Sequence, residues 1–269
     1  MSTVVELSPA VLHIKRGGRR APGAVPVLLP YQRRWVQDTS PMKIWEKSRR
    51  IGADFCEAMS VALTRISGER PVDYWYSSND EDAAREFMQY VADACRAFGT
   101  VVEVITSSMA VDDTEVKLLR IDFTLPPGAT ERPKAAARPS NPKAFRSHGG
   151  DVTISEAAFH SEFPALFKAA KPCTTWGGRL ALLSSHNGES SGFNQHCEMA
   201  RRRLNPAAHG EPRPGDIPWS FHRTTIHDAV AEGLVERINQ VTGGSETREA
   251  WLARMRAECG DPALWSEEF

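Results

Sequence analysis

The sequence has no long apolar run, and none approaches the ~20 residues that a helix needs to cross a bilayer. Its start also lacks the apolar core of a signal peptide. These two absences argue against a membrane protein and against export through a signal peptide.

Paired cysteine motifs are missing too. The 5 cysteines are scattered and odd in number, and neither C-x-x-C nor H-x-x-x-H spacing occurs. This argues against a disulfide framework or a zinc cage and fits a reducing cytosol. A net charge of −1 excludes a global basic field, so a polyanion would have to be held by local patches.

What is present is an ordinary globular composition. The 269 residues, 41% hydrophobic and 25% charged, can bury a sizeable core in one large domain or two small ones. The apolar periodicity predicts strands near residues 42–46, 72–77, 101–105, 116–124, 152–155 and 180–184. It predicts helices near residues 30–38, 55–66, 80–98, 162–170, 193–204 and the end of the chain, and a Pro- and Ala-rich loop near 126–142. This alternation predicts an α/β fold with a mostly parallel central sheet flanked by helices.

The stretch IWEKSRRIGADFCEA, residues 44–58, has the layout of a phosphate-binding loop with a displaced lysine. An apolar segment runs into a basic loop, a glycine follows and an amphipathic helix begins, as in G-x-x-x-x-G-K-[ST]. On that pattern Lys47 takes the first glycine position and Gly52 the second. Ala53 and Asp54 then replace the lysine and the Ser/Thr. The stretch is either a nucleotide site or an ordinary strand-turn-helix connection.

Polar side chains follow two other predicted strands where each strand ends. Ser155 and Glu156 follow GGDVTI, and Ser184, Ser185, His186 and Asn187 follow RLALL. Ligands bind at the carboxyl ends of parallel strands, and an NTPase needs one acid there for the magnesium shell and another to polarise water. Glu156 stands at the water-activating position and Ser155 at that of the magnesium-associated acid. The small polar residues after RLALL can sense a γ-phosphate.

Together, these motifs resemble the large terminase subunit of tailed phages, most closely the Mu-like type. The resemblance covers nearly the whole chain through LLPYQRRW, EKSRRIG, RPSNP, SEAAFH and SSHNG, in this order. It implies a RecA-like P-loop ATPase that uses ATP and Mg2+ to drive double-stranded viral DNA into a procapsid. The implied working unit is a homo-oligomeric ring on the portal protein, assembled with a small terminase subunit in the cytoplasm of the bacterial host. The isolated chain can be a monomer.

The resemblance also implies roles for individual residues. A Tyr-Gln pair lies near the adenine, and some family members carry the loop lysine at its start. The implied ATP-binding residues are Tyr31, Gln32, Lys47, Ser48, Arg49, Arg50, Ile51, Gly52, Ala53 and Asp54. The implied catalytic residues are Glu156, which activates water, and Arg49 or Arg50, which faces the transition-state charge. The implied coupling motif is Ser184, Ser185 and His186.

Two departures from the family pattern put turnover in doubt. Ser155 stands where the family has Asp, so it carries no charge, although its hydroxyl can hydrogen-bond a metal-bound water. Asp54 places a negative charge near phosphates. It either supplies the carboxylate that Ser155 lacks, so that both contact Mg2+ through water, or is a helix N-terminal acid favoured by the dipole. The alternative function is a degenerate, non-hydrolysing nucleotide-binding or DNA-docking module, and a helicase-like ATPase is a third interpretation.

Three segments are expected: an extended basic arm over residues 1–27, the ATPase domain over 28–230 and a helical segment over 231–269. Large terminases normally continue into an RNase H-like nuclease domain, and nothing after Gly210 resembles one. Nuclease activity is therefore not expected, and the chain is interpreted as an isolated ATPase domain or a shortened protein.

Each candidate residue also has a plainer interpretation. Glu156 can be an acid near a helix start, Gln32 a helix surface residue and His186 a loop residue that contacts no phosphate. The arginines of residues 201–203 and of the N-terminal arm can contact DNA phosphates, or they can form solvated faces.

Overall fold

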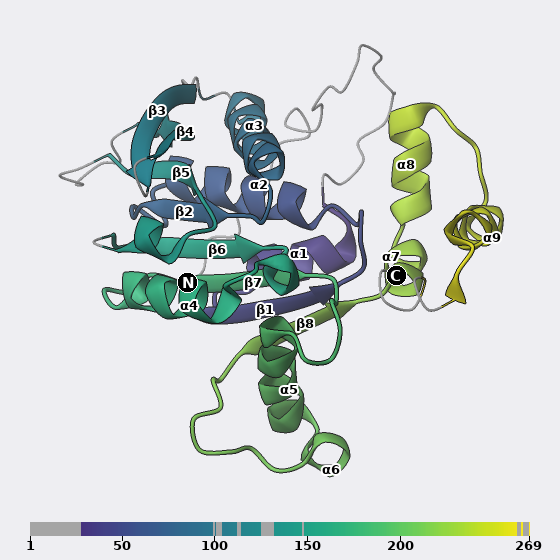
Figure 1. Cartoon of the computed structure of the whole chain (residues 1–269). Helices are drawn as coiled ribbons and strands as arrows, with labels where there is room; N and C mark the ends of the chain where they lie inside the picture. Colours follow the sequence, from purple (N-terminus) through teal and green to yellow (C-terminus); the bar gives the residue numbers. More distant parts are fainter. Residues whose placement is uncertain are drawn as a thin grey trace, which may run out of the picture.

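The computed structural model describes residues 28–98, 100, 104–111, 114–124, 132–146, 148–262, 265 and 269. One eight-stranded sheet runs through this part of the chain, and helices cover both of its faces (Figure 1). The predicted extended arm, residues 1–27, lies outside the described residues. No helix of the described segments is long and apolar enough to cross a membrane.

The strand order of the sheet is β3-β4-β5-β2-β6-β7-β1-β8. The strands from β5 to β8 in this order run parallel, whereas β4 and β3 continue the sheet antiparallel at one edge. The strands are β1 (Met42–Lys47), β2 (Tyr74–Ser77), β3 (Val104–Val111), β4 (Thr114–Asp122), β5 (Lys134–Arg138), β6 (Asp151–Ser155), β7 (Leu180–Ser184) and β8 (Ser220–Thr224). The predicted α/β fold with a mostly parallel sheet is confirmed.

In Figure 1, α2 and α3 lie on one side of the sheet, α4 and α5 lie on the other, and α7, α8 and α9 gather where β8 ends. The helices are α1 (Pro30–Gln37), α2 (Ala53–Ile66), α3 (Glu81–Ala97), α4 (Phe163–Ala170), α5 (Gly192–Leu204), α6 (Pro206–His209), α7 (Ile226–Ala231), α8 (Leu234–Thr242) and α9 (Arg248–Cys259). Short 3-10 turns cover Pro142–Phe145, Ala157–Phe159 and Lys171–Thr174.

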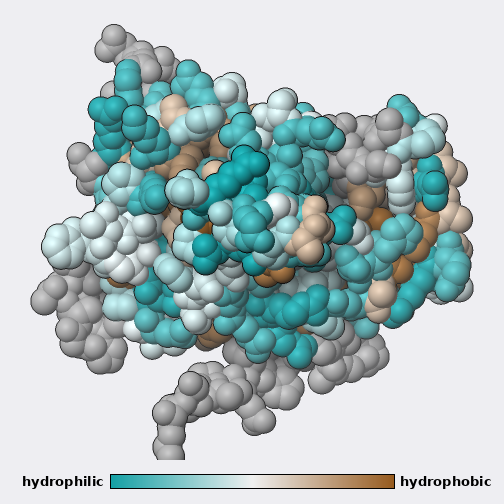
Figure 2. Space-filling model, turned by 90° about the horizontal axis from the view of Figure 1, so that it is seen from below, coloured by the Kyte–Doolittle hydropathy of each residue, from teal (hydrophilic) through white to brown (hydrophobic). Residues whose placement is uncertain are grey.

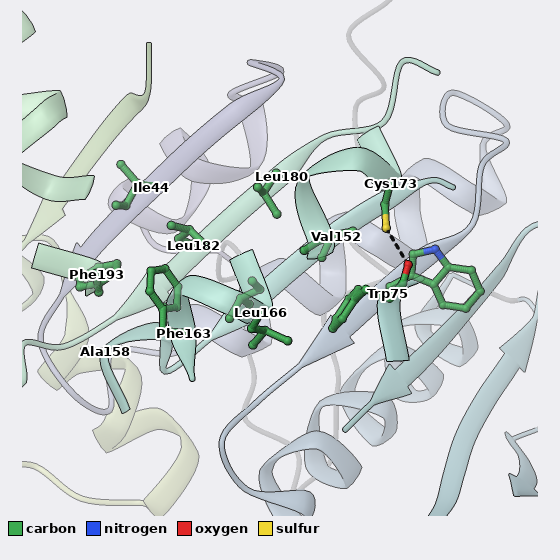
Figure 3. Packing of buried hydrophobic residues seen from close by; sticks show 14 of the residues in the cluster. Ile44, Trp75, Val152, Ala158, Phe163, Leu166, Cys173, Leu180, Leu182 and Phe193 are labelled. Atoms are coloured by element: carbon green, nitrogen blue, oxygen red, sulfur yellow. Dashed lines mark hydrogen bonds between the residues drawn. The ribbon is translucent and has the colours of Figure 1, made fainter. Parts of the chain in front are cut away.

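Strand residues alternate between two buried layers. Trp75, Val152 and Leu180 share one face of the sheet and pack with Phe163 of α4 and Phe193 of α5 (Figure 3). The intervening strand residues point to the opposite face, against α1, α2 and α3. Parallel strands covered on both faces read as nearly continuous apolar runs, which is why the sequence located β6 and β7 so well.

Three strands, β3, β5 and β8, differ from the prediction. β5 lies inside the stretch predicted as a Pro- and Ala-rich loop, which is wrong at residues 134–138. Its sequence KAAAR lacks the β-branched and aromatic residues typical of strands, but its alanines are buried between β4 and β2. β8 lies at the sheet edge and is only partly buried, so it carries little apolar signal. The predicted strand 101–105 overlaps β3 only at its end, and its first residues lie outside the described ones.

The side of the molecule that carries α5 and α6 is mainly hydrophilic, and its apolar surface is broken into small patches (Figure 2). No broad apolar face is visible there among the described residues. The polar residues that the sequence marked lie at the edge of the sheet where the parallel strands end.

Candidate functional site

Three neighbouring strands end in the polar residues that the sequence marked. β6, β7 and β1 lie side by side and parallel, so their carboxyl ends meet at one edge. β1 ends at Lys47, β7 ends at Ser184 and Glu156 follows β6. A pocket of about 590 Å³ opens beside this edge. Of the predicted residues, those that line it are Lys47, Arg49, Arg50, Ile51, Gly52, Ala53, Asp54 and Glu156.

Most of the other wall of the pocket lies outside the quoted sequence motifs. It is formed by the start of α3 and the loop before it, together with two phenylalanines. Its residues are Phe55, Ser78, Asn79, Asp80, Asp82, Ala83, Glu86, Phe87, Tyr90 and Phe159. β2 ends at this same edge, so the strand-end rule that selected Glu156 and Ser184 could also have selected Ser78 and Asn79.

The phosphate-loop candidate is held from behind by α1. The Tyr31 hydroxyl donates to the Ile51 carbonyl at 2.8 Å, and the Gln32 amide donates to the carbonyls of Ile51 and Gly52 at 2.9 and 3.2 Å. Gly52 has φ +75°, and a Cβ there would lie 2.7 Å from Gln32 Nε2. The interpretation of Gln32 as a surface residue is wrong, because its side chain is buried. Contact of this pair with adenine stays a prediction.

Ser48 has a different position from the rest of the loop. It is buried and does not line the pocket, and its amide donates to the Thr224 carbonyl of β8 at 2.9 Å. Arg49 and Arg50 follow it on the exposed side of the loop, and Arg50 has a left-handed backbone with φ +58°. The loop therefore leaves the sheet at Ser48 and presents two guanidinium groups beside Lys47.

The displaced lysine pairs with the predicted catalytic glutamate. Lys47 Nζ lies 3.0 Å from Glu156 Oε1, and the lysine side chain is 4% exposed whereas the glutamate is 28% exposed. The lysine therefore reaches the pocket floor from the first loop position, as a flexible point charge can. Glu156 lines the same pocket.

Glu156 has a backbone that ordinary residues avoid. Its φ of 50° and ψ of 44° are left-handed, which costs a non-glycine residue about 1–2 kcal/mol. The turn that follows is fixed by hydrogen bonds, since Phe159 N donates to Glu156 O at 2.9 Å and Ala158 N donates to Ser184 Oγ at 3.1 Å. Such strain persists only where neighbouring contacts hold it, and it is common at functional sites.

Asp54 contacts Ser155, which lacks the negative charge that Asp54 could supply. Its Oδ1 accepts hydrogen bonds from Ser155 Oγ at 2.7 Å and from the Tyr76 hydroxyl at 3.0 Å. Burial raises the pKa of Asp54, and the nearby Lys47 ammonium opposes that rise. Ser155 is fully buried and does not line the pocket, whereas Asp54 does. The Ser155 hydroxyl thus orients a carboxylate that comes from α2.

The donor groups of the pocket fit a magnesium ion that arrives with a phosphate. Mg2+ is usually held by one or two carboxylates, with waters and substrate phosphates completing its shell. Asp54 and Glu156 provide two carboxylates in the pocket lining. Within the described segments, no group of three or more His, Cys, Asp or Glu side chains could hold a metal. The chemistry therefore matches a nucleotide-bound ion and not a protein-only cage.

The predicted coupling residues line no part of the pocket but contact the elements that do. Ser184 holds the turn after Glu156 through Ala158, and Asn187 Nδ2 donates to the Ala158 carbonyl at 3.1 Å. Asn187 belongs to the same SSHNG motif, whose polar residues the sequence placed at this edge of the sheet. The Ser185 hydroxyl is buried and has no hydrogen-bond partner among the described residues.

His186 contacts the strand that carries the lysine. Its Nε2 lies 3.0 Å from Oε1 of Glu46, the residue before Lys47. Arg201 of α5 pairs with the other oxygen of Glu46, and Arg223 of β8 donates to Oε1 at 3.1 Å. Burial by itself would raise the pKa of Glu46, but the hydrogen bond from His186 and the charge of Arg201 lower it to about 2.

Two of the three arginines at the end of α5 are engaged by acids. Arg201 pairs with Glu46, as described, and Arg202 binds both oxygens of Asp216 at 2.9 and 2.7 Å. Arg203 is exposed. Contact of these arginines with DNA stays a prediction, and the arginines of the N-terminal arm lie outside the described residues.

No family model matches the chain. It is 36% identical over 256 residues to the Mu-like prophage FluMu protein gp28 of Haemophilus influenzae, covering 90% of this chain and 46% of that protein. It is 34% identical over 261 residues to the "Probable terminase, large subunit gp28" of Escherichia phage Mu, covering 94% and 44%. The chain thus spans less than half the length of these relatives.

A solved structure shows the same fold at low sequence identity. The large terminase ATPase domain of Thermus phage P74-26 aligns with a TM-score of 0.53 at 15% identity, over 86% of this chain and 89% of that chain. The large terminase of thermophilic bacteriophage D6E, solved in complex with ADP, aligns at 0.49 and 13% identity, over 78% and 49%. The protein is a homologue of the Mu-like phage terminase large subunit and has the RecA-like fold of terminase ATPase domains.

Proposed function

We propose that this chain hydrolyses ATP to drive double-stranded viral DNA into a procapsid. The observation that carries the proposal is the convergence of Lys47, Asp54 and Glu156 on one pocket at the carboxyl edge of the sheet. A cation, an acid suited to a metal shell and an acid suited to water activation are the groups that phosphoryl transfer needs.

Phosphate binding falls to the loop between β1 and α2. Backbone N–H groups at the start of α2, around Gly52 and Ala53, form a helix N-terminus that favours an anion. Lys47 adds a full positive charge at the pocket floor. A bound phosphate would contact the same Lys47 ammonium group as Glu156 and so weaken the Lys47–Glu156 ion pair. The Glu156 carboxylate can then accept a proton from water.

Asp54 takes the place of the acid that β6 lacks. When bound, Mg2+ neutralises developing charge on the phosphates. The Ser155 and Tyr76 hydroxyls hold one Asp54 oxygen, so the carboxylate is fixed before any ligand arrives. Both hydrogen bonds favour the ionised form of Asp54 and oppose the rise in its pKa that burial causes.

Glu156 orients and deprotonates the attacking water, and Arg49 or Arg50 stabilises the charge of the transferring phosphoryl group. Both arginines lie on the exposed rim of the loop, where a guanidinium can reach a phosphate. Ser184 transmits the state of this turn through β7, and His186 transmits the position of β1 through Glu46. The partners are double-stranded DNA, the portal protein, the small terminase subunit and further copies of this chain in a ring.

The test is phosphate release from ATP with magnesium, with and without double-stranded DNA. Wild type should turn over, whereas Lys47→Ala and Glu156→Gln should not, and calorimetry should show that Glu156→Gln still binds ATP. Ser155→Asp is the matched variant for the altered acid. If wild type neither binds ATP nor turns it over, with or without DNA, the motor proposal fails and the non-hydrolysing module takes its place. Turnover gained only by Ser155→Asp would mean that Asp54 does not replace the missing acid.

A further inference from the structure

His160 bridges the turn that carries Glu156 and the loop that follows β5. Its Nε2 lies 2.9 Å from the Ser155 carbonyl oxygen, and its Nδ1 lies 2.5 Å from Ser140 Oγ. The imidazole is 5% exposed, whereas Ser140 lies at the surface. One buried side chain thus joins the motif SEAAFH to the motif RPSNP.

The hydrogen-bond pattern fixes the form of the imidazole. A carbonyl oxygen can only accept, so Nε2 carries the proton and donates to Ser155. Nδ1 is then the acceptor, and the Ser140 hydroxyl donates to it. Burial lowers the pKa of His160, while the Ser155 carbonyl and Glu156 oppose that change, so the neutral ring fits its surroundings.

The carbonyl that His160 holds belongs to the peptide that leads into Glu156. That peptide plane helps to set φ of Glu156, which is +50° in the left-handed region. On the other side of the turn, Ser184 and Asn187 hold the backbone of Ala158. His160 therefore holds the strand side of this turn, whereas Ser184 and Asn187 hold its far side.

We propose that His160 is a positioning residue that holds the Ser155–Glu156 peptide so that the Glu156 carboxylate stays beside Lys47. The proposal rests on the proposed ATPase function, since the effect is read through Glu156. Without the donor at Nε2, the peptide can rotate, the left-handed backbone relaxes, and the carboxylate moves away from the site of water attack. ATP binding is left intact, because neither His160 nor Ser140 lines the pocket.

A matched pair of amides separates positioning from packing. In His160→Gln the amide nitrogen reaches close to the position of Nε2, whereas in His160→Asn it reaches only toward Nδ1. His160→Phe keeps the ring volume and removes both hydrogen bonds. Ser140→Ala removes the outer hydrogen bond at an exposed position, where water can replace it.

The measurement is steady-state ATP hydrolysis, with kcat and KM determined separately for each variant and ATP affinity measured by calorimetry. A positioned general base contributes about 10²–10⁴-fold, so kcat of His160→Asn and His160→Phe should fall about 10- to 100-fold with KM within about 3-fold of wild type. His160→Gln should recover most of kcat, and Ser140→Ala should lose less than about 3-fold. Equal loss in Gln and Asn variants, or wild-type kcat in His160→Phe, would overturn the proposal.

Two controls keep this outcome separate from other failures. If wild type does not hydrolyse ATP, or Glu156→Gln matches wild type, the proposed function has failed and not the role of His160. Urea unfolding of each variant identifies loss of folding. A crystal structure of the His160→Asn variant then gives a readout without turnover: we expect φ of Glu156 to leave the left-handed region, and an unchanged φ would contradict the proposal.

Discussion

Two lysine–glutamate ion pairs have their lysines on β1, but one pair is buried in the core and the other borders a pocket. Lys43 and Lys47 lie four residues apart on β1, so both point to the face that α2 covers. Lys43 pairs with Glu57 at 3.7 Å, and Lys47 pairs with Glu156 at 3.0 Å. The side chains of the first pair are 7% and 6% exposed, whereas Glu156 is 28% exposed.

The inner carboxylate is saturated by protein groups. Trp35 Nε1 donates to Glu57 Oε2 at 2.7 Å, while the Tyr74 and Thr153 hydroxyls donate to Oε1 at 3.1 and 2.9 Å. The Lys43 ammonium donates to the Trp35 carbonyl at 3.2 Å and lies over the indole ring. A buried polar network that is fully satisfied rigidifies the core around it.

The comparison distinguishes an ion pair inside the core from an ion pair of the same chemistry that borders a pocket. Glu57 is buried outside the pocket and accepts three hydrogen bonds, so we expect its pair to stabilise α1, α2 and the sheet. Glu156 borders a pocket, so its pair with Lys47 can be shared with a ligand. The same substitution at both glutamates should therefore affect different properties.

The largest expected effect is that of Glu156→Gln on turnover. Removal of a general base lowers kcat by about 10²–10⁴-fold, because glutamine cannot accept the proton of the attacking water. The free energy of unfolding should change by less than about 1 kcal/mol, since the position is partly exposed. Phosphate release and urea unfolding on one protein preparation measure both quantities. A loss of stability with normal kcat would reverse the assignment of the two pairs.

Glu57→Gln should show the opposite pattern. Breaking a buried ion pair costs about 3–5 kcal/mol, because Lys43 is left charged and unpaired. Urea unfolding should show this loss. Folded protein at low temperature should keep kcat within about 3-fold of wild type, because Glu57 lies outside the pocket and is no general base. Lys43→Met with Glu57→Gln is the control: replacing both partners should recover much of the stability, and failure to recover would argue against the ion pair as the cause.

The sequence predicted much of this site because strand ends and polar motifs coincide in it. Lys47, Glu156 and Ser184 follow apolar strands, so their convergence follows from a parallel sheet. Glu57 carried no such signal, since an acid inside a predicted helix is usually solvated, and only the tertiary structure brings Trp35, Tyr74 and Thr153 to it.

Other parts of the molecule could not be inferred locally. β5 is an alanine strand whose identity depends on its neighbours, and β8 is an edge strand with a weak pattern. The hydrogen bonds from Ser155 and Tyr76 to Asp54 depend on packing of α2 against β2 and β6. The left-handed backbone of Glu156 is likewise set by contacts from β7 and from His160.

Glu46 lies between the two lysines on β1 but points to the other face of the sheet. Its ionisation should make the stability of the fold depend on pH. Its folded pKa is lowered to about 2 from 4.5: burial by itself raises it, but His186 and Arg201 outweigh that effect. A depressed folded pKa gives stability that is full above pH 4.5 and is lost as pH falls toward 2. At 1.36 kcal/mol per unit, this amounts to about 3 kcal/mol.

Urea unfolding of wild type and Glu46→Gln between pH 7 and the acid limit of folding tests this. The stability difference between the two proteins should be largest near neutrality and shrink as pH falls below 4.5. Glu198→Gln is the matched control, because Glu198 also pairs with Arg201 but is 36% exposed, so its effect should be small. A difference for Glu46→Gln that does not depend on pH would show that its charge is not what stabilises the fold.

The smallest expected effect is that of a change at Gln32 of α1. Its side chain donates hydrogen bonds to the loop between β1 and α2. Gln32→Met keeps the side-chain length but loses the bonds to the Ile51 and Gly52 carbonyls and from Leu29 N, which should cost about 1–2 kcal/mol of unfolding free energy. A loosened loop should weaken ATP binding several-fold in calorimetry and leave kcat nearly unchanged, because Lys47 and Glu156 lie outside the altered contacts. Tyr31→Phe removes only one hydrogen bond and should show a smaller effect in the same direction. Unchanged ATP affinity in Gln32→Met would mean that the loop keeps its shape without α1, and a large fall in kcat would place Gln32 among the groups that position Glu156.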